Sequence, residues 1–395
     1  MKLLAMWYAS IALVLLVLLA SCAQAPESAQ EIVVLADGDA LRKDAAEYAK
    51  DQQVSLDEAV RRLELQDDIG KFEKKLAANE PDTFGGLWIQ HKPAYKVIVN
   101  MTSGTEKIAS YAQDTAFARE IEVHKVATSL KQLETHQRLI VNTLEALKLK
   151  SESSTNVYTN QVELDVLNLD QLTAGLRTLG KLSILEGVLA TRVESFASPE
   201  VNIYGGNNMY CTSGFSVRDG NGTYGITTAD HCPSDLSYGS VRLETLARWN
   251  GSSDLQWQRH TSGTHLYKPW ARDNEPTSGG TNYYREIYGS ANRSDQPIGA
   301  LVCKYGITTR YTCGYLNSKT VTPSDERYSQ PTYMRYGDGT RDMSDGGDSG
   351  GPTYVGHQAW GMHHGGYNSG SHVGNALYMA ANYIASKGLI INLAP

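Results

Sequence analysis

The first half of the chain combines helical and strand-like patterns of apolar and polar positions. Apolar residues recur at helical spacing among many charges in residues 40–79, and residues 127–150 also favour a helix. Phe84–Ile89 and Tyr95–Val99 alternate as the two strands of a hairpin do, and Val157–Val166 indicates a turn and a strand. We therefore expect a small α+β unit before residue 199.

The second half has a different pattern, with short strand-like runs such as Tyr224–Ile226 between many turn residues. It is nearly neutral and rich in Gly, Tyr, Ser and Thr, which is typical of an all-β domain. We expect this domain to span residues 199–395, with its boundary inside residues 196–208. The string Ser198–Glu200 in that boundary has the composition of an exposed processing site.

The beginning of the chain predicts export. The apolar run Ile11–Ala20 follows a positive start and is typical of a signal peptide, which is removed and takes no part in the fold. The string Leu19–Cys22 resembles a bacterial lipobox, whose cysteine thiol receives a diacylglycerol and becomes the new N-terminus. We expect a signal peptide over residues 1–22 and a small, polar tether over residues 23–40. The alternative is ordinary cleavage after Ala25, which the following proline disfavours.

The string Gly347–Pro352 carries the strongest chemical signal. A serine becomes a nucleophile when a base removes its proton and a tight turn exposes its oxygen. Glycines on both sides of Ser349 permit such a turn and let backbone N–H groups approach a reacting carbonyl. A surface loop of Gly, Ser and Asp is the alternative, and a histidine and an acid elsewhere in the chain decide between the two.

Both partners are present upstream. His231 follows a strand-like run and stands beside a cysteine that could pin it, which makes it the candidate general base. Asp254 stands where a polar turn enters an apolar stretch, and a buried aspartate there could orient the imidazole. Asp235 and Asp273 are competitors for this role, but neither leads into such a run.

The order His, Asp, Ser along the chain is the chymotrypsin order. Residues from about 200 to the end resemble a bacterial chymotrypsin-like serine protease of the α-lytic protease and streptogrisin type. The strings that carry the resemblance occur in the family's order: Cys211–Val217, Thr228–Cys232, Val302–Gly314, Gly347–Pro352 and Gly361–Gly366.

The resemblance implies a fold. It predicts two antiparallel six-stranded β-barrels, with His231 and Asp254 on the first and Ser349 on the second. Strings in residues 41–198 loosely resemble the pro-domains of the same family, which assist folding of the protease and inhibit it until removed. The alternative for this α+β region is a separate binding or spacer domain on the cell surface.

The resemblance also accounts for four of the five cysteines. Cys211 and Cys232 match one disulfide of the family, and Cys303 and Cys313 match another. Such bonds require an oxidising compartment. The fifth cysteine is Cys22, and lipidation there would leave no free thiol.

The resemblance also implies that the backbone N–H groups of Gly347 and Ser349 hold the tetrahedral oxyanion. Asp348 lies between these two residues, and a buried carboxylate there needs a partner. The bacterial branch supplies an internal arginine directly after a cysteine, at the position of Lys304 in this chain. We expect a Lys304–Asp348 ion pair, so that activation does not depend on a new N-terminus.

The specificity pocket is predicted from residues around Ser349. Met343 stands where trypsin-like enzymes carry an aspartate, although Asp342 is one residue away. His363 aligns with the histidine that glutamyl endopeptidases use with a serine near the Ser344 position, and this favours an acidic P1 side chain. The alternative is a broad apolar pocket. The proposed lining set is Met343, Ser344, His363, His364, Gly365 and Gly366, of which His364 replaces the family's usual serine.

These observations predict a secreted or surface-anchored serine endopeptidase that is made as a precursor. Its expected location is outside the cell or in the bacterial envelope. Its expected partners are protein or peptide substrates, its own pro-region, and a membrane reached through the lipid on Cys22. No cofactor or metal is implied, and the net charge of −7 gives no reason to expect nucleic acid. The alternative classes are a latent zymogen and a non-catalytic binding module that keeps the protease fold.

Overall fold

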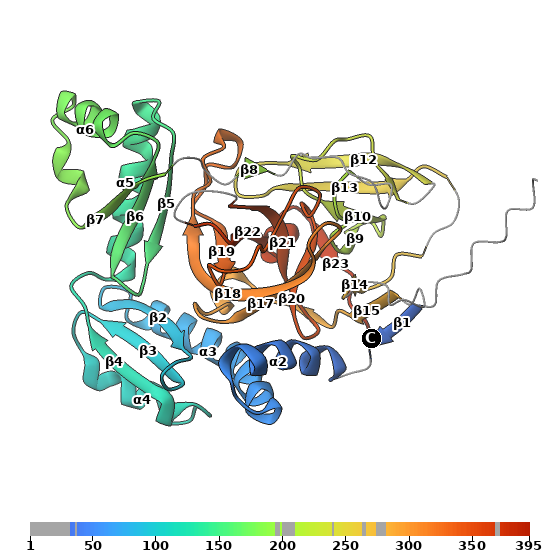
Figure 1. The fold of residues 1–395 in the computed structure, drawn as a ribbon, viewed down its shortest axis with the longest axis horizontal. Coiled ribbons are helices and arrows are strands. Elements are labelled where there is room, and N and C mark those ends of the chain that lie inside the picture. The colour runs from blue at the N-terminus through green and yellow to red at the C-terminus, as the bar shows by residue number, and fades with distance from the viewer. Residues whose placement is uncertain are drawn as a thin grey trace, which may run out of the picture.

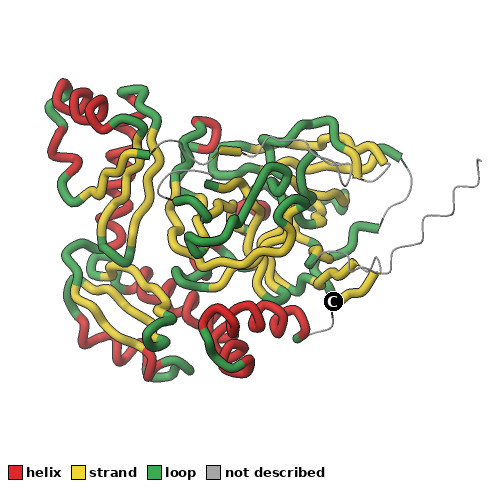
Figure 2. Tube along the Cα trace, in the orientation of Figure 1, coloured by secondary structure: helices red, strands yellow, loops and turns green. Residues whose placement is uncertain are grey.

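The computed structural model describes residues 32–35, 38–193, 198–199, 210–238, 241–262, 266–273, 282–367 and 372–395. The predicted signal peptide, Cys22 and most of the boundary after Pro199 lie outside these residues. Within them, no helix is long and apolar enough to cross a membrane. Helices gather in the N-terminal half and strands dominate the C-terminal half, as Figure 2 shows.

The N-terminal half forms two small α+β layers along one side of the molecule (Figure 1). Each layer is a three-stranded sheet covered by helices, in the strand orders β2-β3-β4 and β5-β6-β7. The elements of the first layer are α2 (Asp39–Gln52), α3 (Leu56–Asn79), β2 (Phe84–Gln90), β3 (Lys96–Met101), α4 (Ile108–Ala112) and β4 (Ile121–Lys125). Those of the second are α5 (Leu130–Ala146), β5 (Ser151–Asn156), β6 (Gln161–Val166), α6 (Leu169–Thr178) and β7 (Val188–Arg192).

The helical pattern over residues 40–79 forms two helices. The chain turns at Gln53, whose φ is 58°, and Ser55 then caps α3 by accepting a hydrogen bond from the Glu58 N–H at 3.2 Å. The hairpin of β2 and β3 is antiparallel, as its alternation predicts. Strand β5 has the polar sequence SESSTN, which gave no strand signal. Its residues are nonetheless buried, because β5 packs between β6 and β18 (Arg310–Val321).

Part of the segment predicted to be a tether is described by the structure. Strand β1 (Ile32–Leu35) pairs in parallel with β15 (Asn282–Glu286), and β15 pairs with β14 (Trp270–Arg272). Helix α2 then starts at Asp39. The start of the N-terminal region is thus attached to the C-terminal half.

The C-terminal half is the expected all-β region. Its first sheet has six strands in the order β11-β12-β13-β10-β9-β23. They are β9 (Ser216–Asp219), β10 (Tyr224–Thr228), β11 (Ser237–Tyr238), β12 (Val241–Trp249), β13 (Leu255–His260) and β23 (Leu389–Ile391).

The second sheet closes into a six-stranded barrel, because β21 and β22 pair and complete the order β21-β20-β17-β18-β19-β22. Its further strands are β17 (Leu301–Gly306), β19 (Tyr333–Gly337), β20 (Pro352–Val355), β21 (Gln358–Gly366) and β22 (Asn375–Ala380). A short strand, β16 (Gly289–Ser290), adds to β21, and helix α7 (Asn382–Ala385) leads to β23. The prediction of an α+β region followed by an all-β region is confirmed. The second sheet is one of the two expected six-stranded barrels, whereas no pairing among the described residues closes the six strands of the first sheet.

The N-terminal region docks on the second barrel through buried polar contacts. The side chain of Arg285 has no exposed area and donates to both carboxylate oxygens of Asp44 in α2, at 2.9 and 3.0 Å. Asp44 also accepts from the Gly356 N–H at 2.7 Å. Breaking a buried pair of this kind by removing one partner costs about 3–5 kcal/mol, because the other charge stays buried.

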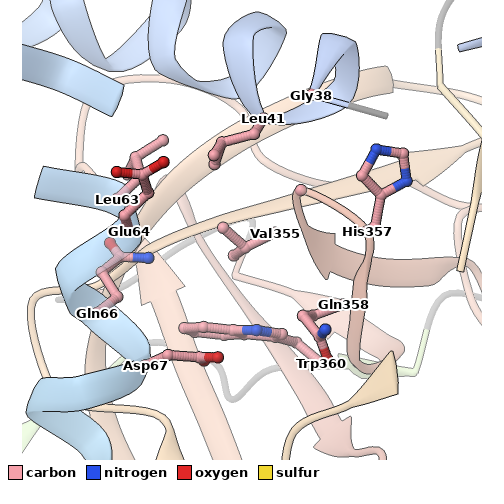
Figure 3. A pocket seen from close by; sticks show the side chains of 11 residues that line it. Gly38, Leu41, Leu63, Glu64, Gln66, Asp67, Val355, His357, Gln358 and Trp360 are labelled. Atoms are coloured by element: carbon pink, nitrogen blue, oxygen red, sulfur yellow. The ribbon is translucent and has the colours of Figure 1, made fainter. Parts of the chain in front are cut away.

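A cavity of about 300 Å³ lies where α2 and α3 meet the β20–β21 turn (Figure 3). Leu41 and Asp67 line it from the helices, and Val355, His357 and Trp360 line it from the barrel. None of the residues that line this cavity belongs to the predicted catalytic set.

Candidate active site

The first sheet places a histidine beside an aspartate. Because β10 and β13 are antiparallel neighbours, the end of β10 at Thr228 lies opposite the start of β13. His231 follows the end of β10, and Asp254 directly precedes β13. The His231 Nδ1 is 2.7 Å from Asp254 Oδ2, and the His231 backbone N–H donates to Asp254 Oδ1 at 3.1 Å. The disulfide between Cys211 and Cys232 ties this corner together.

Electrostatics keep this aspartate ionised. Burial by itself would raise the pKa of Asp254, but the charge and hydrogen bond of His231 and the hydrogen bond of His364 outweigh it and hold that pKa well below its usual range. An ionised carboxylate only accepts, so His231 must carry its proton on Nδ1. In the neutral imidazole Nε2 is then the acceptor, and this atom is buried without a hydrogen-bond partner among the described residues.

The second barrel supplies the serine on a tight turn. Gly347 and Gly350 have φ of 101° and 83°, values that side chains other than hydrogen rarely allow. A Cβ at Gly350 would lie 2.2 Å from Thr228 Oγ1, so this glycine packs directly on the end of β10. Ser349 precedes it, but no hydrogen bond joins the Ser349 Oγ to His231, whose Nε2 has no partner among the described residues. The Ser349 Oγ donates to the carbonyl of His364 at 3.4 Å.

Asp348 is fully buried and paired with Lys304, whose Nζ is 2.8 Å from its Oδ2. The backbone N–H groups of Thr308 and Thr309 donate to the other carboxylate oxygen at 2.8 and 3.1 Å. Burial raises the pKa of Asp348, but the charge of Lys304 and the hydrogen bonds from the Lys304 and Thr309 side chains outweigh it and lower the pKa to about 2. The sequence did not predict this role of the two threonines, because nothing in the hairpin turn that contains them indicates a contact with Asp348.

The turn also leaves two backbone donors available. The N–H groups of Asp348 and Gly350 bond to the carbonyls of Asp345 and His363. Those of Gly347 and Ser349 donate to no acceptor among the residues that the structure describes. Such a pair of N–H groups can receive the negative oxygen of a tetrahedral intermediate.

The predicted pocket wall brings two polar side chains together. His363 Nε2 and Ser344 Oγ are 2.5 Å apart, and both residues are buried. Burial, and then the charge of Lys304, hold the pKa of His363 well below its usual value, so the ring is neutral. Met343 is also buried and joins the apolar core of the barrel.

The end of β21 borders this wall and carries a short partner strand. Gly365 and Gly366 pair antiparallel with Pro199 and Ser198 of β8 (Ser198–Pro199). Ser198 and Pro199, which belong to the predicted boundary, therefore lie beside the two glycines that follow His363 and His364 in the sequence.

The chain is similar in sequence to known proteases. No family model matches the chain. It is 25% identical over 369 residues to Serine protease 1 of Rarobacter faecitabidus, and the match covers 89% of this chain and 63% of that protein. It is 28% identical over 189 residues to Glutamyl endopeptidase 2 of Streptomyces griseus, which covers 45% of this chain and 88% of that protein. The chain thus spans less than two thirds of the Rarobacter protein.

Solved structures match about half of the chain. Nocardiopsis protease (NAPase) has 27% identity and a TM-score of 0.39, with 48% of this chain and 98% of that chain covered. A glutamic acid specific serine protease has 25% identity and a TM-score of 0.39, with 48% and 99% covered. The chain is thus similar in sequence to serine proteases, among them a glutamyl endopeptidase.

Two residues of the site differ from those that are usual in the proteases that this chain resembles. Lys304 stands where the bacterial branch has arginine, and it reaches Asp348 as a single donor. His364 stands at the family's usual serine position, and its Nδ1 is 2.7 Å from Asp254 Oδ2. The ring nitrogens of His231 and His364 and the Asp254 carboxylate lie within 4.8 Å of one another, and hydrogen bonds link them.

Proposed function

We propose that this protein is a serine endopeptidase with His231, Asp254 and Ser349 as its catalytic triad. The observation that carries the proposal is the His231–Asp254 pair, whose open Nε2 lies at the same corner as the Ser349 turn. The two curated relatives support it, since both are named as peptide-bond hydrolases.

In this proposal the chemistry is acyl transfer. Ser349 attacks a peptide carbonyl while His231 Nε2 takes its proton, and Asp254 stabilises the imidazolium that forms. The Gly347 and Ser349 N–H groups hold the oxyanion, and one such donor is worth about 10²–10³ in kcat. His231 then returns the proton to the leaving amine, and water hydrolyses the acyl-enzyme. Lys304 contributes by holding Asp348, and with it the oxyanion turn.

We further propose a preference for acidic P1 side chains. The adjacent His363 and Ser344 can donate hydrogen bonds to a carboxylate, and an uncharged side chain would not accept them. The pairing of β8 with β21 is a second support. Glu200, which lies outside the described residues, directly follows Pro199 in the sequence, so the strand beside the pocket leads straight to an acidic residue. Buried Met343 favours the second candidate, an apolar pocket.

The N-terminal region is proposed to be a pro-region that is removed after export, with a lipid on Cys22 as the anchor of the precursor. The β8–β21 pairing supports removal near Pro199, because it lays the boundary segment beside the proposed active site. The alternative roles are a permanent spacer domain and a latent zymogen. Mass spectrometry of the cell-associated protein tests both points, because it reads the mass on Cys22 and the new N-terminus together.

A serine-directed phosphonate probe tests the proposed activity. The full chain, expressed with export, should label at Ser349, and the Ser349→Ala variant should not. Peptides that differ only at P1 (Glu, Asp, Leu, Phe, Arg) then give the specificity. Absence of labelling with an intact fold would favour the binding module, and a clear preference for Phe or Arg would overturn the acidic pocket.

A further inference from the structure

The cavity between the N-terminal helices and the second barrel (Figure 3) combines apolar walls with a few polar groups. Its volume of about 300 Å³ suits a small molecule. Leu41 in α2 and Val355 in β20 form apolar walls on opposite sides. Leu63, Gln66 and Asp67 are three and four residues apart in α3, so one face of this helix presents them to the cavity.

Gln66 presents a hydrogen-bond donor to this cavity. The residue is only 3% exposed. Its Oε1 accepts from the Leu301 N–H at 2.7 Å, which fixes the orientation of the amide, because only the oxygen can accept. The Nε2 is buried and has no partner among the described residues, and in Figure 3 it points from α3 toward the space beside Val355. A buried donor without an acceptor costs free energy, so an oxygen atom in the cavity would be stabilising.

Two carboxylates of the cavity lining, those of Glu64 and Asp67, lack a cation. Both residues are exposed to solvent, and neither has a hydrogen-bond or ion-pair partner among the described residues. The described residues that line the cavity include no lysine or arginine. Desolvation raises the pKa of Asp67, and the charge of Lys71 opposes this only in part. The charge of the lining therefore favours a cationic ligand.

Trp360 supplies an aromatic surface for such a cation. It is buried, and Figure 3 shows its indole ring nearly edge-on, with one face turned toward the space beside Val355. The face of a tryptophan ring attracts cations, and more strongly where water is excluded. An organic ammonium ion can also bury its carbon atoms against the apolar walls, whereas a small metal ion would gain nothing from them.

We propose that this cavity binds a small organic ammonium ion that also carries an oxygen acceptor. The cation contacts the Trp360 ring and is balanced by the carboxylates of Glu64 and Asp67. The oxygen accepts a hydrogen bond from Gln66 Nε2. The inference does not rest on the proposed function, because none of the residues that line the cavity belongs to the proposed triad or pocket.

The position of the cavity gives the ligand an effect on the whole chain. Its walls come from α2 and α3 on one side and from the second barrel on the other, so the site exists only while the N-terminal region is docked. A ligand that binds one state alone shifts the equilibrium toward that state. The ammonium ion should therefore help to retain the N-terminal region on the barrel.

Choline is the first probe, because it joins a quaternary ammonium to one hydroxyl oxygen. Calorimetric titration uses the full chain with Ser349→Ala, which stays unprocessed whether or not the proposed activity exists. We expect a Kd of about 0.1–1 mM, as is reasonable for so small a ligand. Neutral 3,3-dimethylbutan-1-ol has the same shape without the charge and should bind at least about tenfold more weakly. Propyltrimethylammonium, which lacks the oxygen, should bind about 3- to 10-fold more weakly.

Substitutions in α3 test the carboxylates. Asp67→Asn and Glu64→Gln each remove one charge with little change of shape, and each should weaken choline binding about 3- to 10-fold. Asp68→Asn is the matched control, because Asp68 pairs with Lys71 and does not line the cavity. It should leave the Kd unchanged. Choline, but not the neutral alcohol, should also raise the midpoint of thermal unfolding.

The outcomes separate this site from the proposed function. Equal binding of choline and the neutral alcohol, or no binding of choline by the folded chain, would overturn the proposal. An equal loss of affinity in D67N and D68N would overturn it as well, because surface charge in general would then be responsible. Vesicles of phosphatidylcholine, compared with free choline, distinguish a lipid headgroup from a soluble ligand, and binding of either supports the site. If choline binds but the unsubstituted chain does not label with the phosphonate probe, the proposed function fails and the site stands.

Discussion

The two β regions of the C-terminal half supply the site in different ways. In the first sheet, His231 and Asp254 are 23 residues apart, and one antiparallel ladder between β10 and β13 brings them together. In the second barrel, Ser349 depends on distant contacts, because the neighbouring Asp348 pairs with Lys304 across 44 residues. The acid–base pair is therefore a product of local topology, whereas the nucleophile is placed by long-range packing.

The contacts between the two regions make them one unit. Thr212, from the first region, donates through its Oγ1 to the Gly347 carbonyl at 2.7 Å and accepts from the Ile307 N–H at 3.0 Å. In the other direction, His364 reaches from the second barrel to Asp254. Each region thus stabilises the functional turn of the other.

The strongest test of this unity is to remove one catalytic group from each region. If the proposed triad acts as a unit, His231→Ala and Ser349→Ala should each lower kcat by about 10⁶, and the double variant should lose no more than either single one. Steady-state kinetics with the best peptide of the P1 panel measures all three. Losses that multiply in the double variant would mean that the two regions act independently.

The second-largest expected fall in kcat comes from removing the charge of Lys304. Lys304→Met leaves the Asp348 carboxylate buried without its cation and should loosen the turn that carries both oxyanion donors. We expect kcat to fall about 10²–10³-fold, the value of one oxyanion donor. Lys319→Met is the matched control, since that lysine pairs with Glu73 far from the turn. If kcat in K304M is unchanged, the position of Ser349 does not depend on the long-range pair, and local topology determines it as it does for His231 and Asp254.

A third test concerns only the wall of the second barrel. His363→Leu should lower kcat/KM for a P1 Glu peptide about 100-fold while leaving a P1 Leu peptide within about threefold, because one donor to the carboxylate is lost. Ser344→Ala should act in the same direction and more weakly. An equal loss for both peptides would assign His363 to packing in place of specificity.

The smallest expected effect is on stability and its pH dependence. The pKa of Asp348 is about 2 in the folded protein and about 3.9 in an unfolded chain, so the unfolded state binds protons first as pH falls. The pairing should contribute about 2 kcal/mol above pH ~4 and lose it progressively toward pH ~2. Urea unfolding across this range, compared with Asp348→Asn, measures the contribution. An identical pH slope in the variant would contradict it.

The sequence predicted elements where the pattern was local. The hairpin of β2 and β3 alternates along its length, and the strand-like run at Tyr224 is β10. The sequence did not predict elements whose burial depends on a partner distant along the chain. The polar strand β5 is buried because Thr155 bonds to Thr320 of β18, and no pattern within β5 records that neighbour.

For the site, the sequence by itself determined the residue types and their order: a serine between glycines, a histidine after a strand, an aspartate before one, and two pairs of cysteines. These signals are local, because turns and strand ends are encoded by neighbouring residues. Only the tertiary structure decided the pairings, such as Thr308 and Thr309 on Asp348 and the shared oxygen between His231 and His364. A hydrogen bond between barrels exists only once both are packed, so its partner cannot be read from either strand alone.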